Sequence, residues 1–254
     1  MKVAYCLLSL VLFCCNVSGQ IEFGMKAGLS LPCLISTSSD NPESKGYRSI
    51  RGHDFSVYVE RVYTRNFSFR MQLEYAIEGG RKRGNQAFTD VPQVNDILPP
   101  GEQASYLYAN YNSELRIAYL MVPLQAKFNV EVSDHWGLFF IAGPFIGFPV
   151  SARNRTSGSS IVYFDEKHTK PLTEDLQVLD GDENVRNIIR SFNAGVSESM
   201  GINYRSRRHK IFFETGGNFG FVNIYKSKKR GINHTGNMTA SIGYGLYFSL
   251  PTRR

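Results

Sequence analysis

Apolar and polar residues alternate with a period of two along residues 66–77, the clearest pattern in the chain. The apolar positions are Phe67, Phe69, Met71, Leu73, Tyr75 and Ile77, and the positions between them are Ser68, Arg70, Gln72, Glu74 and Ala76. Side chains of a β-strand point to alternate faces, so the pattern predicts a strand with one apolar and one polar face. A two-faced strand of about ten residues is typical of a membrane β-barrel.

Seven further segments predict strands: residues 21–29, 54–63, 115–130, 136–150, 192–204, 210–222 and 237–248. The connections are alternately long (32–52, 79–112, 151–190, and the medium 223–236) and short (63–66, 131–134, 205–209). Outer-membrane barrels have an even strand number, short periplasmic turns and long external loops. We therefore predict an all-β fold, an eight-stranded antiparallel up-and-down transmembrane β-barrel with both termini periplasmic. Barrel closure removes the sheet edges, and at this strand number side chains fill the interior.

Two details refine the predicted strands. Glycines 137, 143 and 147 share one face of their strand, which lets the sheet curve closely. Glu198 falls on an otherwise apolar face, and we expect a bulge or a register shift to account for it.

The N-terminus predicts a secretory signal peptide over residues 1–19 and a barrel domain over residues 20–254. Lys2 precedes a short apolar run that ends near Gly19, so the mature chain is expected to begin at Gln20. The run is too short for a transmembrane helix, and a buried first helix of a cytosolic domain is the weaker alternative. The signal removes three cysteines and leaves Cys33 alone, which excludes an internal disulfide and a cysteine-based metal cluster.

The formal net charge of +7 falls to +6 when Lys2 is removed. Basic residues cluster at 81–83, 205–210 and 226–230, each between predicted strands. These clusters either attract phosphate-bearing lipid or other polyanions, or are solvated loop charge. The expected partners are outer-membrane lipid including lipopolysaccharide, and envelope or secretion-complex proteins, with no nucleic acid.

Four short motifs resemble those of the PorT-like outer-membrane β-barrel domain of Gram-negative bacteria. They occupy residues 24–29, 73–75, 119–127 and 142–148, the last two being a Pro-containing strand and a Gly-Pro-aromatic strand. Met121 departs from the family, where a glutamate commonly stands, and the chain continues past Phe248. The resemblance implies the fold and the location but no reaction, and one named member of the family assists protein secretion.

No catalytic, cofactor-binding or metal site is predicted. The five histidines lie in loops or at strand ends without ligand spacing, and neither a G-x-S-x-G motif nor a phosphate-binding glycine loop occurs. The acidic segment 180–184 suggests calcium, but it lacks the ligand series of a calcium loop and is better interpreted as a solvated loop. Inward charges are expected at Arg70, Glu74, Lys127 and Glu214, and we interpret them as ion pairs that fill the barrel rather than as a polar pathway or an active site.

The preferred function is a non-enzymatic outer-membrane barrel with a structural, surface-interaction or secretion-accessory role. One alternative is an outer-membrane enzyme acting on lipid or peptide at the barrel rim, which would need a nucleophile, a base and an orienting group close together. The other is a soluble lipocalin-like barrel with an apolar ligand inside. The faces separate these models, because a membrane barrel places Leu73 outward and Gln72 inward, and a lipocalin does the reverse.

Overall fold

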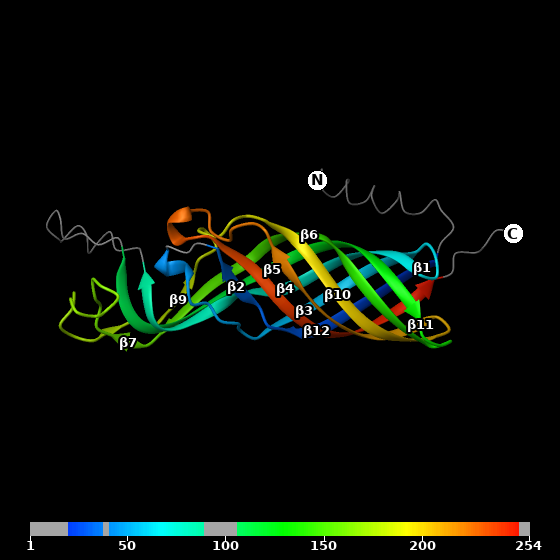
Figure 1. Cartoon of the computed structure of the whole chain (residues 1–254), viewed down its shortest axis with the longest axis horizontal. Helices are drawn as coiled ribbons and strands as arrows, with labels where there is room; N and C mark the ends of the chain where they lie inside the picture. Colours follow the sequence, from blue (N-terminus) through cyan, green and yellow to red (C-terminus); the bar gives the residue numbers. More distant parts are fainter. Residues whose placement is uncertain (1–19, 38–40, 89–105, 249–254) are drawn as a thin grey trace.

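The computed structural model describes residues 20–37, 41–88 and 106–248. The predicted signal peptide, residues 1–19, lies outside the described residues. Eight antiparallel strands form a closed ring in which β12 pairs with β1 (Figure 1). In ring order they are β1 (Gln20–Ser30), β3 (Gly52–Val62), β4 (Phe67–Phe88), β5 (Leu107–Glu131), β6 (Trp136–Ser157), β10 (Asn193–Ser206), β11 (His209–Gly220) and β12 (Asn233–Phe248). The predicted eight-stranded barrel is therefore confirmed.

Short strands and turns lie at one end of this ring. β2 (Cys33–Ser36) pairs with β12, and β9 (Gly181–Asn184) pairs with β6. A separate two-stranded sheet holds β7 (Ser159–Ser160) and β8 (Gln177–Val178), and the 3-10 turns are η2 (Pro42–Ser44) and η3 (Lys228–Arg230). We call this end the loop end, and the opposite end, with the three short turns, the turn end. No helix in the described ranges is long and apolar enough to cross a bilayer.

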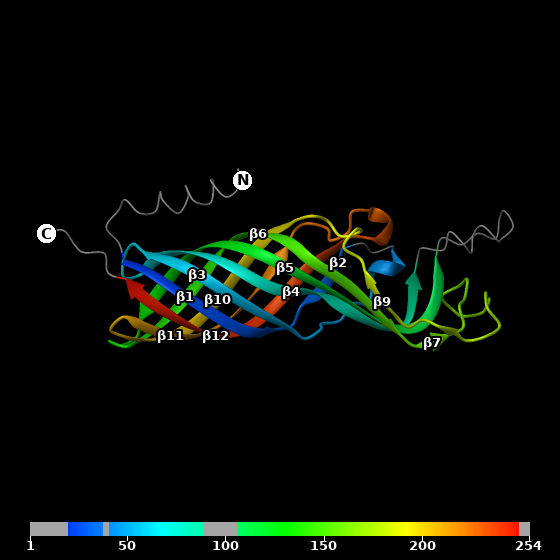
Figure 2. The same cartoon turned by 180° about the vertical axis from the view of Figure 1, so that it is seen from behind.

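Strands β4, β5 and β6 continue beyond the other strands at the loop end (Figures 1 and 2). The prediction of loops over residues 79–112 and 151–190 was wrong at these strands, because β4 runs on to Phe88, β5 begins at Leu107 and β6 ends at Ser157. The cause is physical: beyond Ile77 both faces of the extension carry polar residues, so the alternation that marks a half-apolar strand disappears while the backbone pairing continues.

The barrel is polar inside and apolar outside. Leu73 on β4 is 46% exposed, whereas its neighbour Gln72 is 2% exposed and faces the lumen. The same arrangement repeats around the ring, with Val57 and Phe140 on the outside and Glu60 on the inside. A soluble lipocalin-like barrel has the reverse arrangement, so that alternative was wrong.

The strand carrying Glu198 is regular. β10 pairs without interruption to β6 and β11, and Glu198 lies opposite Ala142 and Gly217 with its side chain exposed on the outer face. The expected bulge or register shift at this residue was therefore wrong. A register irregularity occurs instead between Ala118 and Tyr119, on β5 where it pairs with β6.

Close strand packing requires glycine at Gly143, on the inner face of β6. A Cβ atom at this position would lie 2.0 Å from the carbonyl oxygen of Leu124 on β5, well inside contact distance. The neighbouring backbone cannot move away without breaking the sheet, which explains why a residue without a side chain stands here.

Candidate functional site: a filled lumen beneath a pocket at the loop end

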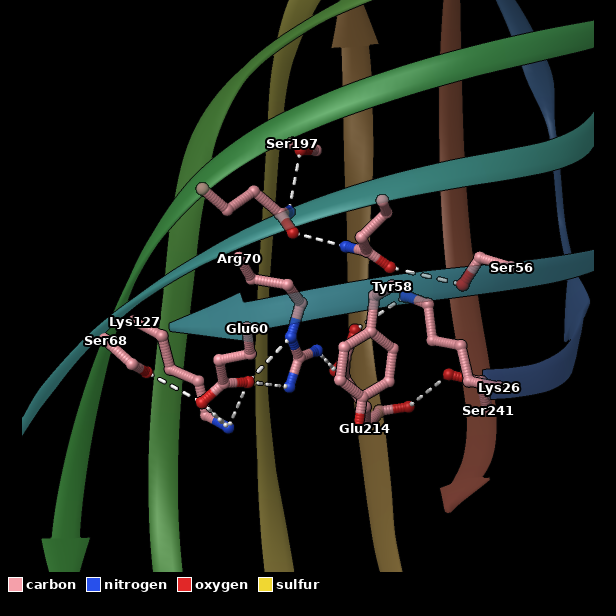
Figure 3. A network of polar contacts seen from close by, with 12 residues as sticks. Lys26, Ser56, Tyr58, Glu60, Ser68, Arg70, Lys127, Ser197, Glu214 and Ser241 are labelled. Carbon is pink, nitrogen blue, oxygen red and sulfur yellow. Dashed lines mark hydrogen bonds and ion pairs between the residues drawn. The ribbon is translucent and has the colours of Figure 1, made fainter. Parts of the chain in front are cut away.

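A buried ion network lies in the lumen (Figure 3), and several of its members, such as Glu60 and Lys127, stand on their strands near the turn end. Its centre is the carboxylate of Glu60 on β3, which accepts hydrogen bonds from Arg70 Nε and Nη2 at 3.0 and 2.8 Å. Lys127 Nζ lies 3.0 Å from the same carboxylate, and the Ser68 hydroxyl donates to it at 2.7 Å. Strands β3, β4 and β5 supply these four side chains, so the network joins neighbouring strands across the inner face.

The opposite wall completes the network through Glu214 on β11. Arg70 Nη1 donates to Glu214 at 3.0 Å, and Lys26 Nζ from β1 donates to it at 2.7 Å. Arg70, 0% exposed, therefore bridges two carboxylates on opposite sides of the barrel. Its guanidinium also lies 4.2 Å from the ring centre of Tyr58, a cation–π contact.

A third carboxylate, Glu22 on β1, belongs to the same layer. It accepts hydrogen bonds from Lys210 Nζ at 2.6 Å and from the Tyr58 hydroxyl at 2.5 Å. Lys210 was grouped with the basic cluster 205–210 and predicted to begin a strand. It is the second residue of β11 and is 0% exposed in the lumen, so it is a buried charge rather than loop charge. Three carboxylates and four cations thus meet inside the barrel.

Three of the four predicted inward charges, Arg70, Lys127 and Glu214, are joined in this network. Glu74 also faces the lumen, but within the described ranges it lies in no ion pair. The sequence analysis did not single out Glu22, Lys26, Glu60 and Lys210, although the first three occupy the polar positions of alternating strands. Strand alternation was therefore the signal that could have found them.

Amides and hydroxyls form the next layer toward the loop end. Gln72 donates to the Gln125 side chain, which donates to the Ser197 hydroxyl at 2.9 Å, and Ser56 donates to Gln72 at 3.2 Å. These bonds span β3, β4, β5 and β10. Buried polar groups are costly unless they are hydrogen-bonded. The hydrogen bonds of this layer therefore stabilise its buried side chains, which fill the space between the walls of the barrel.

An apolar plug closes the lumen above the polar layers. Tyr119, Met121 and Phe145 project inward from β5 and β6, and Ile189 and Ile224 descend onto them from the loops before β10 and β12. The two loops are tied together by a backbone hydrogen bond from Arg190 N to the Ile224 carbonyl at 2.8 Å. Met121, which stands where the resembling family commonly has glutamate, is thus part of an apolar cluster.

A pocket of about 330 Å³ lies above the plug, between the extended strands and the loops. Tyr47 and Tyr225 form one wall, with their hydroxyl oxygens 3.2 Å apart. Lys82 on β4 lies with its Nζ 4.4 Å from the Tyr47 ring centre and donates a hydrogen bond to the backbone carbonyl of Glu43. Tyr111 lines the same pocket from β5. The volume and concavity of the pocket suit a small ligand, and its lining is mainly polar with three tyrosines.

Burial shifts the acid–base behaviour of the pocket residues. Lys82 lies on β4 beyond Ile77, outside the apolar outer band, and burial lowers its pKa to about 8 against the opposing attraction of Glu43. Burial raises the pKa of Tyr47 well above its usual range, and raises the pKa of Tyr111 to about 12. The tyrosines therefore stay neutral hydrogen-bonding groups at physiological pH, while Lys82 exchanges its proton near neutrality.

The remaining candidate residues are dispersed over the molecule. His53 and His135 stack on tyrosines near opposite ends of the barrel, and the Nε2 of His168 lies 2.8 Å from Asn85 Oδ1. Within the described ranges, no three His, Cys, Asp or Glu side chains are grouped to hold a metal ion. The acidic segment 180–184 includes β9, where Asp182 pairs with two arginines of β6.

The comparison with protein families agrees with this architecture. A family model described as "Outer membrane protein beta-barrel domain" matches residues 16–226. No curated protein matches the chain. Among solved structures, the Neisserial surface protein A is similar, with 10% identity and a TM-score of 0.41 over 89% of this chain and 97% of that one.

Two further structures are similar at the same level. OprG of Pseudomonas aeruginosa has 8% identity and a TM-score of 0.40, over 92% of this chain and 97% of that one. Ail, the attachment invasion locus protein of Yersinia pestis, has 9% identity and a TM-score of 0.38, over 91% of this chain and 100% of that one.

Proposed function

The chain belongs to the outer membrane protein β-barrel domain family, and on that premise we propose that it is a non-enzymatic barrel that binds a ligand at the cell surface. The observation that carries this proposal is the division of the barrel interior. The ion network and the apolar plug fill the lumen, while the pocket above them is open and lined by side chains from several segments. A lumen filled by side chains leaves no open channel for a solute, which favours a role in attachment at the surface over a role in transport.

The proposed orientation places the loop end outside the cell and both termini in the periplasm. Its support is the contrast between the two ends. The short turns lie at one end, together with the start of β1 and the end of β12, and the extended strands lie at the other. Single cysteines in a Cys33→Ser background test it. Lys167→Cys should react with a membrane-impermeant maleimide on intact cells, and Asp134→Cys only after the outer membrane is opened. The opposite labelling pattern would reject the orientation.

The lining of the pocket favours a saccharide ligand. Tyr47, Tyr111 and Tyr225 offer aromatic faces with hydroxyl groups, and Gln86 and Asn154 offer amides that both donate and accept hydrogen bonds. Sugars present hydroxyls around apolar ring faces, which these groups complement. Purified protein on a glycan array is the test. Tyr111→Ala and Asn154→Ala should each abolish binding that Tyr63→Ala, at the turn end, retains, and binding that survives both pocket changes would refute this ligand site.

A rim enzyme is the competing function, and the geometry of the pocket does not favour it. Ser113, a hydroxyl lining the pocket, donates at 3.0 Å to Asn154 Oδ1, which is an amide oxygen and cannot accept a proton as a general base. Activation of a serine needs such a base within hydrogen-bond reach. Hydrolysis of lipid or peptide substrates by pure protein, lost in Ser113→Ala, would revive this alternative.

A secretion-accessory role is the second candidate, and the PorT-like resemblance favours it. The two most distinctive motifs lie side by side in the sheet, because Pro123 on β5 pairs with Phe145 on β6. In-cell crosslinking from the turn end, at Arg65 and Arg208, is the test. Capture of defined envelope or secretion-complex proteins would support this role, and crosslinks confined to abundant lipoproteins would count against it.

The chain is also proposed to associate with outer-membrane lipid, including lipopolysaccharide. This proposal follows from the apolar outer face, on which residues such as Leu73 and Phe140 are exposed around the ring.

A further inference from the structure

Arginines gather on the outer face of the extended strands, in a row set by the strand pairing. Arg48 pairs with Arg81 on β4, Arg81 with Glu114 on β5, Glu114 with Arg155 on β6, and Arg155 with Asp182 on β9. Residues directly opposite in antiparallel strands have their side chains on the same face, about 5 Å apart. The row therefore runs sideways across the barrel wall rather than along one strand.

A second pair lies one step nearer the apolar band. Arg116 on β5 is directly opposite Arg153 on β6. We call Arg48, Arg81, Arg116, Arg153 and Arg155 the arginine patch. Only two carboxylates, Glu114 and Asp182, lie on the same rows, so the patch has an excess of positive charge.

The carboxylates do not neutralise the patch. Arg116 Nε lies 2.5 Å from Glu114, while Arg153 and Arg155 share one oxygen of Asp182 at 3.1 and 3.2 Å. The Nε of Arg81 is buried and, among the described residues, has no hydrogen-bond partner. Like charges directly opposite in a sheet are destabilising, and an anion between Arg116 and Arg153 would remove that repulsion.

The patch borders the apolar outer band directly. A hollow of about 270 Å³ on the outer wall has Tyr75, Ile77 and Ala118 on its apolar side. Its polar side holds one carboxylate, Glu114, with Ser151 and three arginines, Arg116, Arg153 and Arg155. Below it Leu120 and Phe148 are exposed on the same wall. Charged side chains next to a lipid-facing band mark the level of the lipid headgroups.

We propose that the arginine patch binds the phosphate groups of the outer-leaflet glycolipid, the lipid A part of lipopolysaccharide. Arginine matches phosphate geometry with paired N–H donors. The row from Arg48 to Arg155 crosses three strand spacings, about 14 Å, which suits a headgroup with two phosphates better than a single one. The apolar side of the hollow would face the sugar edges and the first acyl carbons. The proposal rests on the proposed orientation, which places this wall in the outer leaflet.

Full-length mature protein in detergent micelles is titrated with bis-phosphorylated lipid A, and binding is followed by native mass spectrometry. Wild type should bind saturably, and Arg116→Gln with Arg153→Gln should weaken binding about 10-fold or more, since charge-assisted hydrogen bonds are lost. Arg65→Gln with Arg208→Gln removes two exposed arginines at the turn end and should leave binding unchanged. Arg116→Lys with Arg153→Lys keeps the charge but loses the paired donors, so it should weaken binding measurably but less than the Gln pair does.

Titrations with three other compounds test which chemical group the patch recognises. Dephosphorylated lipid A and phosphatidylglycerol should bind at least about 10-fold more weakly, and inorganic phosphate should not compete at equal concentration. Equal binding of any of these, or wild-type affinity in the Gln pair, would overturn the proposal. Folding of each variant is checked by its mobility on unheated gels, and the Lys pair supplies the comparison if the Gln pair does not fold. Micelles impose no orientation, so failure here is separate from failure of the cysteine-labelling test.

Discussion

Arg70 is the residue whose loss should most weaken the barrel from inside. It makes three hydrogen bonds to Glu60 and Glu214 and is 0% exposed, so Arg70→Met leaves two carboxylates short of a partner in a water-poor interior. Removing one partner of a buried ion pair costs about 3–5 kcal/mol. The lower part of that range is expected, because Glu60 keeps Lys127 and Glu214 keeps Lys26.

The assay is urea unfolding of protein folded into phospholipid vesicles. Trp136, the single tryptophan, is exposed on the outer face at the turn end and reports lipid contact through its emission. Arg70→Lys keeps the charge but loses the fork of donors, so its loss should be smaller than that of Arg70→Met. Arg65→Met, at an exposed turn, should stay within about 0.5 kcal/mol of wild type.

A double-mutant cycle with Glu60→Gln isolates the interaction itself. Residues in one ion-pair network are coupled by about 0.5–3 kcal/mol, so the double variant should be less destabilised than the sum of the single variants. A loss below about 1 kcal/mol in Arg70→Met, or strict additivity with Glu60→Gln, would refute the view that the network holds the walls together.

Four further outcomes are expected. Leu73→Arg should cost about 2–4 kcal/mol in vesicle folding if its position is at midplane, and Gln72→Arg should cost less because it enters a lumen that already holds charges; equal losses would contradict the assignment of faces. Pure protein in planar bilayers should give no steady porin-like conductance, since the ion network and the plug fill the lumen. The wild type should gain stability relative to Lys82→Met as the pH rises from about 8 to 10.5, because in that window the unfolded chain binds the proton and the folded chain, with its lowered Lys82 pKa, does not; parallel pH curves would argue against a buried Lys82. Mass measurement of the mature protein should give a chain that begins at Gln20, and a retained Met1 would contradict the predicted signal cleavage.

Strand alternation made the barrel wall predictable. It separated Leu73 from Gln72 and grouped Arg70 with Gln72, because one residue's face in a strand fixes that of its neighbours. The alternation of long and short connections then favoured a membrane barrel, which places Leu73 outside and Arg70, Lys127 and Glu214 in the lumen. Charge clustering was less informative than alternation. Lys210 follows a run of basic residues that resembles solvated loop charge, yet β11 begins at His209 and the lysine is buried.

The plug and the pocket were not predictable, because they depend on contacts between distant segments. Ile189 and Ile224 are isolated apolar residues in polar loops, and nothing near them in the sequence shows that they meet Tyr119. Lys82 likewise belongs to a basic run, but strand geometry beyond the apolar band turns it inward to the pocket while Arg81 faces outward. Local patterns carry no information on such pairings.

The apolar plug gives the loops before β10 and β12 a second structural role. Because Ile189 and Ile224 belong to loops rather than to strands, the segments that vary most readily in sequence also close the lumen. A change that remodels these loops therefore also acts on the packing that fills the lumen. Sequence change at the loop end is therefore limited by the packing of the loops on the plug as well as by the surroundings that the loops contact.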